Sequence, residues 1–253
     1  MGYCGIPSFF LIKSRFCSQI RSSSKMKNNF PNFITLLNAF CGCCAIVSVF
    51  ENQMLAAAAW LGLGAVADFM DGTVARWLNA KSALGKQLDS LADMISFGVA
   101  PGLILYTFLA NGEDGLVWKA VPAFVLTLAA CFRLAKFNID PRQTNSFIGL
   151  PTPACTLFVV GLLLIAHYNS FGLRAFVSHP LWLYGCIAGL SYLMISELPM
   201  FGFKFERLRW RGNELKIIFA AVALFLLIFF REAAPALVIL IYLLISITIA
   251  ILK

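Results

Sequence analysis

Long apolar runs alternate with short polar connections along almost the whole chain. Eight of these runs approach the ~20 residues that an α-helix needs to cross the hydrocarbon core of a bilayer. They predict helices at about 33–50, 54–78, 84–109, 117–137, 151–167, 180–197, 215–230 and 235–252. The pattern therefore predicts an all-α fold, a polytopic membrane bundle of about eight transmembrane helices.

The composition excludes an ordinary soluble domain. Of the 253 residues, 60% are hydrophobic and only 13% are charged, and the mean hydropathy is +0.83. Globular domains usually carry about 25% charged residues. We therefore expect a single transmembrane domain at 33–253, preceded by a basic N-terminal extension at 1–32.

The extension has five basic residues, no acidic residue and the serine run 22–24. This composition is compatible with a transit peptide. Met26 offers an equally good start, in which case 1–25 would be a dispensable extension. Both interpretations stay open from the sequence.

The basic residues predict the orientation in the membrane. With eight spans, both termini lie on one side, and that side would hold seventeen of the twenty Lys and Arg residues. The other side keeps only Lys119, Arg174 and Arg231. The positive-inside tendency then places both termini in the cytoplasm. The net charge of +8 follows from this topology and from anionic lipid headgroups, so we expect no nucleic-acid partner.

Four aspartates interrupt the second and third apolar runs: Asp68, Asp71, Asp89 and Asp93. Each ionised carboxylate at membrane depth costs at least ~2.5 kcal/mol, so a compensating partner is expected. The spacings i, i+3 and i, i+4 place each pair on one helix face, on either side of the polar turn 79–82. All four fall within roughly 12–20 Å of helix from that turn. The sequence thus predicts a four-carboxylate cage near the cytoplasmic end of a tight helical hairpin.

Carboxylate oxygens favour Mg²⁺, Mn²⁺ or Ca²⁺ over zinc or copper. Four carboxylates suffice for two bridged ions, and a two-ion site suits transfer of a phosphoryl group. Buried ion pairs that only fix helix packing are one alternative. A channel or a divalent-ion transporter lined by the acids is another, although acids at a single depth argue against a conduction path.

Small residues accompany the carboxylates. Gly72 and Ala75 clear one helix face, and Gly85 clears the facing helix, so a phosphate or a nucleoside could approach the backbone there. Arg76 follows one turn after Gly72, where its guanidinium could hold a diphosphate.

The segment from Asp68 to Asp93 matches D-x2-D-G-x2-A-R-x8-G-x3-D-x3-D without departure, and so resembles the CDP-alcohol phosphatidyltransferase family. The resemblance implies a membrane enzyme in which a hydroxyl displaces CMP from a CDP-linked substrate. The first three aspartates would bind two divalent ions, Mg²⁺ or Mn²⁺ with Ca²⁺ as an alternative. Asp93 would also lie at the ion site and act as general base. The implied CDP-binding residues are Gly72, Ala75, Arg76 and Gly85.

Other segments, at 31–38, 93–101, 132–138 and 147–154, are similar to the membrane-bound phosphatidylserine synthases of that family. The similarity runs from about Met26 onward and fades over the last two predicted spans. It implies CDP-diacylglycerol and L-serine as substrates, an active site facing the cytoplasm, a bacterial cytoplasmic membrane and a homodimer. Glycerol 3-phosphate, an inositol compound or choline remain alternative acceptors.

A zwitterionic acceptor such as serine needs a cation for its carboxylate. Arg133 and Lys136, at the cytoplasmic end of the fourth span, are the candidates, with Asn138 as a further polar contact. Ordinary positive-inside anchoring is the alternative for the two cations. The loop at 149–153 could line the same pocket, or could simply start the fifth helix.

Overall fold

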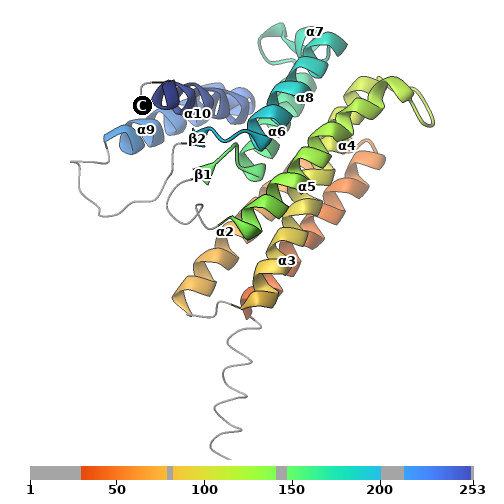
Figure 1. Cartoon of the computed structure of the whole chain (residues 1–253). Coiled ribbons are helices and arrows are strands. Elements are labelled where there is room, and N and C mark those ends of the chain that lie inside the picture. Colours follow the sequence, from red (N-terminus) through yellow and green to blue (C-terminus); the bar gives the residue numbers. More distant parts are fainter. Residues whose placement is uncertain (1–29, 79–81, 141–146, 201–213, 252–253) are drawn as a thin grey trace, which may run out of the picture.

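The computed structural model describes residues 30–78, 82–140, 147–200 and 214–251, and helices dominate these ranges (Figure 1). This confirms the predicted helical fold. Most of the basic extension 1–32 lies outside the described residues. The helices are the first helix (Phe30–Phe50), α2 (Met54–Trp77), α3 (Ala83–Asp93), α4 (Ala100–Ala110), α5 (Phe124–Ile139), α6 (Thr152–Tyr168), α7 (Arg174–Val177), α8 (Pro180–Ile195), α9 (Glu214–Phe230) and α10 (Ala234–Ile251).

Each predicted apolar run contains a helix, but the helices differ in length. A π-helical segment, Met94–Val99, joins α3 to α4, and a 3-10 helix, Trp118–Ala123, leads into α5. Helices α6 and α8 have 17 and 16 residues, about 24–26 Å, which is short for a hydrocarbon core of about 30 Å. The segments long and apolar enough to cross a membrane are Phe30–Phe50, Met54–Trp77, Ala83–Ala110, Trp118–Ile139 and Lys216–Ala250. The number of helices that cross the membrane therefore stays a prediction.

The last of these segments is two helices. A 3-10 turn at Arg231–Ala233 separates α9 from α10, and the two pack against each other. Helix α10 also packs along α6, beside which it lies in Figure 1. A Cβ on Gly161 of α6 would come within 2.8 Å of the Cα atom of Ala236, so the glycine permits this close approach.

The outer surface is apolar. Phe69 and Trp77 on α2 are 71% and 83% exposed, and large exposed hydrophobic side chains occur on most of the long helices. The buried core lies where α4, α5, α6, α8 and α10 meet. A bundle with a packed interior and an apolar exterior is the arrangement of an integral membrane protein.

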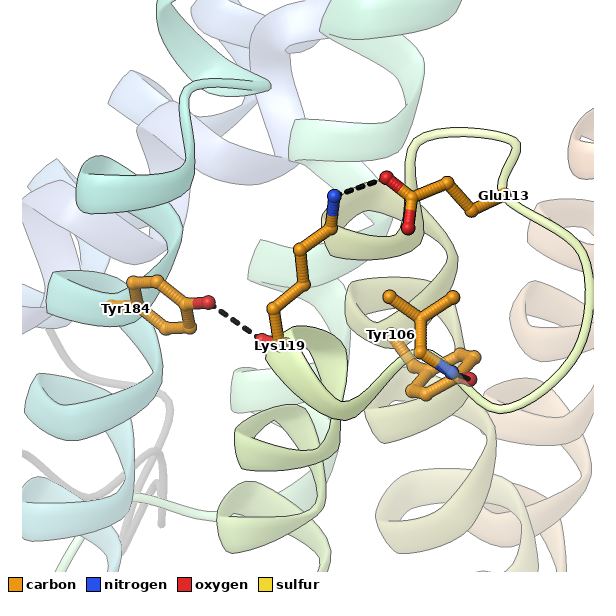
Figure 2. Close-up of polar contacts among 5 residues, drawn as sticks. Tyr106, Glu113, Lys119 and Tyr184 are labelled. Carbon is orange, nitrogen blue, oxygen red and sulfur yellow. Dashed lines mark hydrogen bonds and ion pairs between the residues drawn. The ribbon is translucent and has the colours of Figure 1, made fainter.

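The two ends of the bundle differ. The end of α2 and the start of α3 lie at one end, and α7 lies at the other (Figure 1). At the α7 end, Figure 2 shows the connection from α4 to α5 held by side chains. The Tyr106 hydroxyl accepts a hydrogen bond from the Val117 N–H at 2.9 Å, Lys119 pairs with Glu113, and the Tyr184 hydroxyl donates to the Lys119 carbonyl at 2.6 Å. These contacts tie α8 to the α4–α5 connection, far along the helices from the aspartates.

One pair of short strands departs from the all-helical prediction. Strand β1 (Phe147–Ile148) pairs antiparallel with β2 (Pro199–Met200). The following residue, Gly149, has φ +75°, and a Cβ there would lie 2.7 Å from the Met194 carbonyl oxygen. The loop is thus fixed on the end of α8.

Candidate functional site

The four aspartates lie at two depths near one end of the bundle. Asp71 and Asp89 are each about 9 Å of helix from the facing ends of α2 and α3, and Asp68 and Asp93 are about 14–15 Å away. The antiparallel course of the two helices therefore opposes Asp71 to Asp89 and Asp68 to Asp93.

Three of the four carboxylates converge. One oxygen from each of Asp68, Asp71 and Asp89 lies within 4.8 Å of the other two. Asp71 is only 5% exposed, and its Oδ2 atom is buried with no hydrogen-bond partner in the described part of the chain. A buried carboxylate oxygen without a donor is unfavourable, and a divalent cation would satisfy it. The donor set therefore fits Mg²⁺, Mn²⁺ or Ca²⁺.

Asp93 lies beside this trio without belonging to it. Its carboxyl group interacts with that of Asp68, and the Nδ2 atom of Asn38 donates a hydrogen bond to its Oδ1 atom at 3.3 Å. Asn38 is fully buried, and its main-chain carbonyl accepts a hydrogen bond from the Ser96 hydroxyl at 2.9 Å. The first helix therefore anchors the Asp93 carboxylate through the Asn38 side chain. Within the predicted group of four carboxylates, three cluster together and Asp93 is separately anchored.

The π-helical segment begins directly after Asp93. Its Phe97 and Gly98 carbonyls accept hydrogen bonds from the hydroxyls of Thr156 on α6, at 3.2 Å, and Thr127 on α5, at 3.0 Å. π-Helical turns within α-helices are frequent at functional sites. Side chains from α5 and α6 thus fix the backbone that directly follows Asp93.

A pocket of about 520 Å³ opens between the end of α2 and the start of α3. The two helices are separated here, in contrast to the tight hairpin that the sequence predicted. The pocket contains five positions of the signature together with part of the first helix. Its lining residues are Pro31, Asn32, Thr35, Asp71, Gly72, Ala75, Ser82, Ala83, Gly85, Lys86 and Asp89.

The two signature glycines do different things in this pocket. A Cβ on Gly72 would meet no other atom within 4 Å, so its backbone faces open space. A Cβ on Gly85 would lie 3.0 Å from both Asn32 Oδ1 and Ser82 Oγ. Ser82 caps α3 by accepting a hydrogen bond from the Gly85 N–H at 2.9 Å. Gly72 leaves room for a ligand, and Gly85 lets the first helix approach the start of α3.

Arg76 does not line the pocket. Its Nε atom donates to the Gly72 carbonyl at 2.9 Å and its Nη2 atom to the Thr73 hydroxyl at 3.2 Å, so the guanidinium lies along its own helix. Among the described lining residues, Lys86 is the one with a cationic side chain. Sequence reasoning missed Lys86 because it stands at a variable position of the signature.

Arg133 is buried and interacts electrostatically with Asp93. It is 7% exposed, its charge acts on the Asp93 carboxylate, and its Nη1 atom lies 3.4 Å from the Thr152 hydroxyl. The Nε atom is buried with no hydrogen-bond partner in the part of the chain that the structure describes. This burial does not fit a residue that only anchors the protein to lipid headgroups.

Lys136 and Asn138 have other partners. The Lys136 ammonium pairs with Glu197, which follows α8, at 3.0 Å. The Asn138 side chain donates to the Ser90 hydroxyl at 2.7 Å and so links α5 to α3. Of the three predicted acceptor-binding residues, the structure brings Arg133 to Asp93 and engages the other two in contacts between helices.

Comparison with known proteins adds to this geometry. The family model for CDP-alcohol phosphatidyltransferase matches residues 28–194, well over half of the chain. This chain belongs to the CDP-alcohol phosphatidyltransferase family. The match includes all four aspartates, and it ends before α9 and α10, in line with the predicted fading of similarity over the last two spans.

Several proteins similar to this chain are named CDP-diacylglycerol–serine O-phosphatidyltransferase. The protein of that name from Bacillus subtilis is 35% identical over 177 residues, 70% of this chain and 92% of the relative. One from Helicobacter pylori is 35% identical over 205 residues, 80% of this chain and 82% of the relative. One from Mycobacterium leprae is 37% identical over 178 residues, 67% of this chain and 57% of the relative.

Proposed function

We propose that this phosphatidyltransferase transfers the phosphatidyl group of CDP-diacylglycerol to the hydroxyl of L-serine and releases CMP. The convergence of Asp68, Asp71 and Asp89 beside a pocket lined by signature residues carries the reaction type. The names of the relatives support serine as the acceptor.

The donor occupies the pocket between α2 and α3. Its volume of about 520 Å³ is within the range of small-molecule sites. Gly72, Ala75 and Gly85 present a surface without large side chains to the CDP moiety. Arg76 reaches the diphosphate after its guanidinium leaves the Gly72 carbonyl and the Thr73 hydroxyl.

Asp68, Asp71 and Asp89, with Asp93 at the edge of the group, hold two divalent ions, Mg²⁺ or Mn²⁺, with Ca²⁺ as the alternative. Bound ions of this kind neutralise charge on the phosphate oxygens during displacement. Through these ions the aspartates would hold the donor phosphate at the site.

Asp93 acts as the general base. The serine Oγ forms a bond to the phosphorus of the phosphatidyl group and gives its proton to the Asp93 carboxylate. The bond from that phosphorus to the oxygen of CMP breaks, and CMP leaves with the electron pair. Asn38 holds the Asp93 carboxylate through its 3.3 Å hydrogen bond during this step.

Arg133 binds the serine carboxylate. Its buried Nε–H group has no acceptor among the described residues, so it can donate to a substrate. The Arg133 charge also acts on Asp93, near which the serine hydroxyl must lie. Lys136 and Asn138 take part as well if they exchange their present partners for serine. We place the whole reaction in one domain, residues 33–253, at the cytoplasmic face of a bacterial cytoplasmic membrane, with the protein as a homodimer.

An acceptor screen with purified protein tests the proposal. CMP release that requires CDP-diacylglycerol, Mg²⁺ or Mn²⁺, and L-serine is the expected result. Release only with glycerol 3-phosphate, an inositol compound or choline would retain the chemistry and exclude serine. Absence of CMP release with every acceptor, together with divalent-ion flux in proteoliposomes, would favour an ion transporter.

A further inference from the structure

We infer that Lys86 is a further donor-binding residue, whose ammonium group contacts the diphosphate of the CDP-linked lipid. The inference rests on the proposed function, because it assumes that the pocket between α2 and α3 binds a cytidine diphosphate. It concerns a residue outside the signature, at a variable position between Gly85 and Asp89.

Charge balance calls for a cation here. Two divalent ions would neutralise the charges of the four aspartates. The diphosphate of the donor, with a negative charge on each phosphate, would then need a further cation from the protein. The guanidinium of Arg76 is one candidate, but it is hydrogen-bonded to its own helix. Lys86 supplies the cationic side chain among the described lining residues.

The start of α3 favours an anion at the same place. The N-terminal turn of α3 borders the pocket, which is lined there by Ser82, Ala83, Gly85 and Lys86. The N-terminus of a helix carries a partial positive charge and attracts phosphate groups. Lys86 adds a full charge on the first turns of this 11-residue helix.

The present partner of Lys86 is one that a phosphate can replace. Its Nζ atom donates to the Asn138 carbonyl oxygen at 2.7 Å, in an exposed setting. A lysine ammonium has three donors on a flexible stem, and a hydrogen bond to an anionic oxygen is stronger than one to a neutral carbonyl. Donor binding therefore draws Lys86 from Asn138 toward the phosphate or adds the phosphate as a second acceptor.

The test measures binding of cytidine, CMP and CDP to the purified full-length protein by titration calorimetry, with Mn²⁺ present. For Lys86→Gln we expect about 10- to 100-fold weaker CDP binding and unchanged cytidine binding, because a charged hydrogen bond to phosphate is lost. The KM for CDP-diacylglycerol should rise by a similar factor, with less than about twofold change in the KM for serine. Lys86→Arg should restore most of the CDP affinity.

Two variants separate phosphate binding from a structural role. Ser90→Ala removes the other hydrogen bond between α3 and Asn138 and leaves the pocket charge intact. Lys119→Gln removes the same charge at the opposite end of the bundle. Both should bind CDP as the unmodified protein does.

CDP affinity unchanged in Lys86→Gln would overturn the inference, as would an equal loss of cytidine and CDP binding or an equal loss in Ser90→Ala. Cytidine binding also reports that the variant is folded. None of these titrations uses serine, so a failure of the serine assignment would leave the result on Lys86 intact.

Discussion

Asn38 and Asp93 are joined by a hydrogen bond from Nδ2 to Oδ1 at 3.3 Å, across 55 positions of sequence. The asparagine is fully buried in the first helix, and the aspartate stands where α3 becomes a π-helix. The first helix is thus a structural part of the candidate site.

Replacing Asn38 with Ala should slow turnover without abolishing donor binding. Loss of the hydrogen bond frees the Asp93 carboxylate to rotate, so we expect kcat to fall about 10- to 100-fold, with CDP affinity changed less than about threefold. Ser48→Ala is the matched control, because among the described residues that hydroxyl donates to the carbonyl of Cys44 in the same helix. A fall in CDP affinity as large as the fall in kcat would point to a packing defect.

Asp93→Asn should abolish turnover and leave CDP-lipid binding largely intact. The variant keeps the shape of the side chain and removes its ability to accept the serine proton, while Asp68, Asp71 and Asp89 remain. Single-turnover CMP release and CDP titration measure the two effects. Asp114→Asn, on the connection after α4, provides the control. Near-normal turnover would contradict the role of Asp93 as base.

Asp71→Asn should weaken metal binding more than it affects folding. The buried Oδ2 atom is replaced by an amide that cannot act as an anionic ligand, so half-maximal activity should need at least about tenfold more Mn²⁺. Binding of Mn²⁺ followed by electron paramagnetic resonance provides a readout independent of turnover. Equal Mn²⁺ affinity in the variant and the unmodified protein would exclude Asp71 as a ligand.

Arg133→Ala should raise the KM for serine with little change in the KM for CDP-diacylglycerol, because the guanidinium is assigned to the acceptor carboxylate. The KM for serine should rise about tenfold or more, because one charged hydrogen bond to the substrate is lost. Lys119→Ala, which breaks the ion pair with Glu113 at the opposite end of the bundle, is the control for the loss of a cation outside the site. Equal changes in both KM values would indicate that Arg133 supports folding instead.

Gly149→Ala should destabilise the protein. The residue has φ +75°, which costs a non-glycine residue about 1–3 kcal/mol, and the new methyl group would lie 2.7 Å from the Met194 carbonyl oxygen. Gly189→Ala in α8 is the control, since a Cβ there meets nothing within 4 Å. Thermal unfolding in detergent compares the two variants. Equal Tm values would show that the backbone after β1 can move to accommodate the methyl group.

Much of the candidate site could be predicted from the amino-acid sequence. Asp68, Asp71, Asp89 and Asp93 were identified because carboxylates stand out in apolar sequence, and helical periodicity placed each pair on one face. Gly72, Ala75 and Gly85 were found from the same spacing, and the structure places all three on the pocket. These predictions depend on local geometry within one pair of helices.

Other residues escaped prediction because their neighbours are distant in sequence. Lys86 was counted only among the basic residues of the predicted cytoplasmic side, and Asn38 only as the last residue of the segment 31–38. The sequence also could not show that Lys136 and Asn138 bond to Glu197 and Ser90, while their contact with the acceptor stays a prediction. Nothing in a local pattern shows which helix will lie opposite such a side chain.

The amino-acid pattern alone was enough to establish a helical membrane protein, the positions of its apolar helices and a group of four carboxylates suited to divalent ions, because hydrophobicity and helical spacing act over a few turns. The transferase reaction was implied by the resemblance of the aspartate motif to a known family. Tertiary packing decided that three aspartates converge while Asp93 is held apart by Asn38, that Arg133 is buried beside it, and that α2 and α3 separate around a pocket. These features depend on how close helices approach, which is set by contacts between residues far apart in the chain.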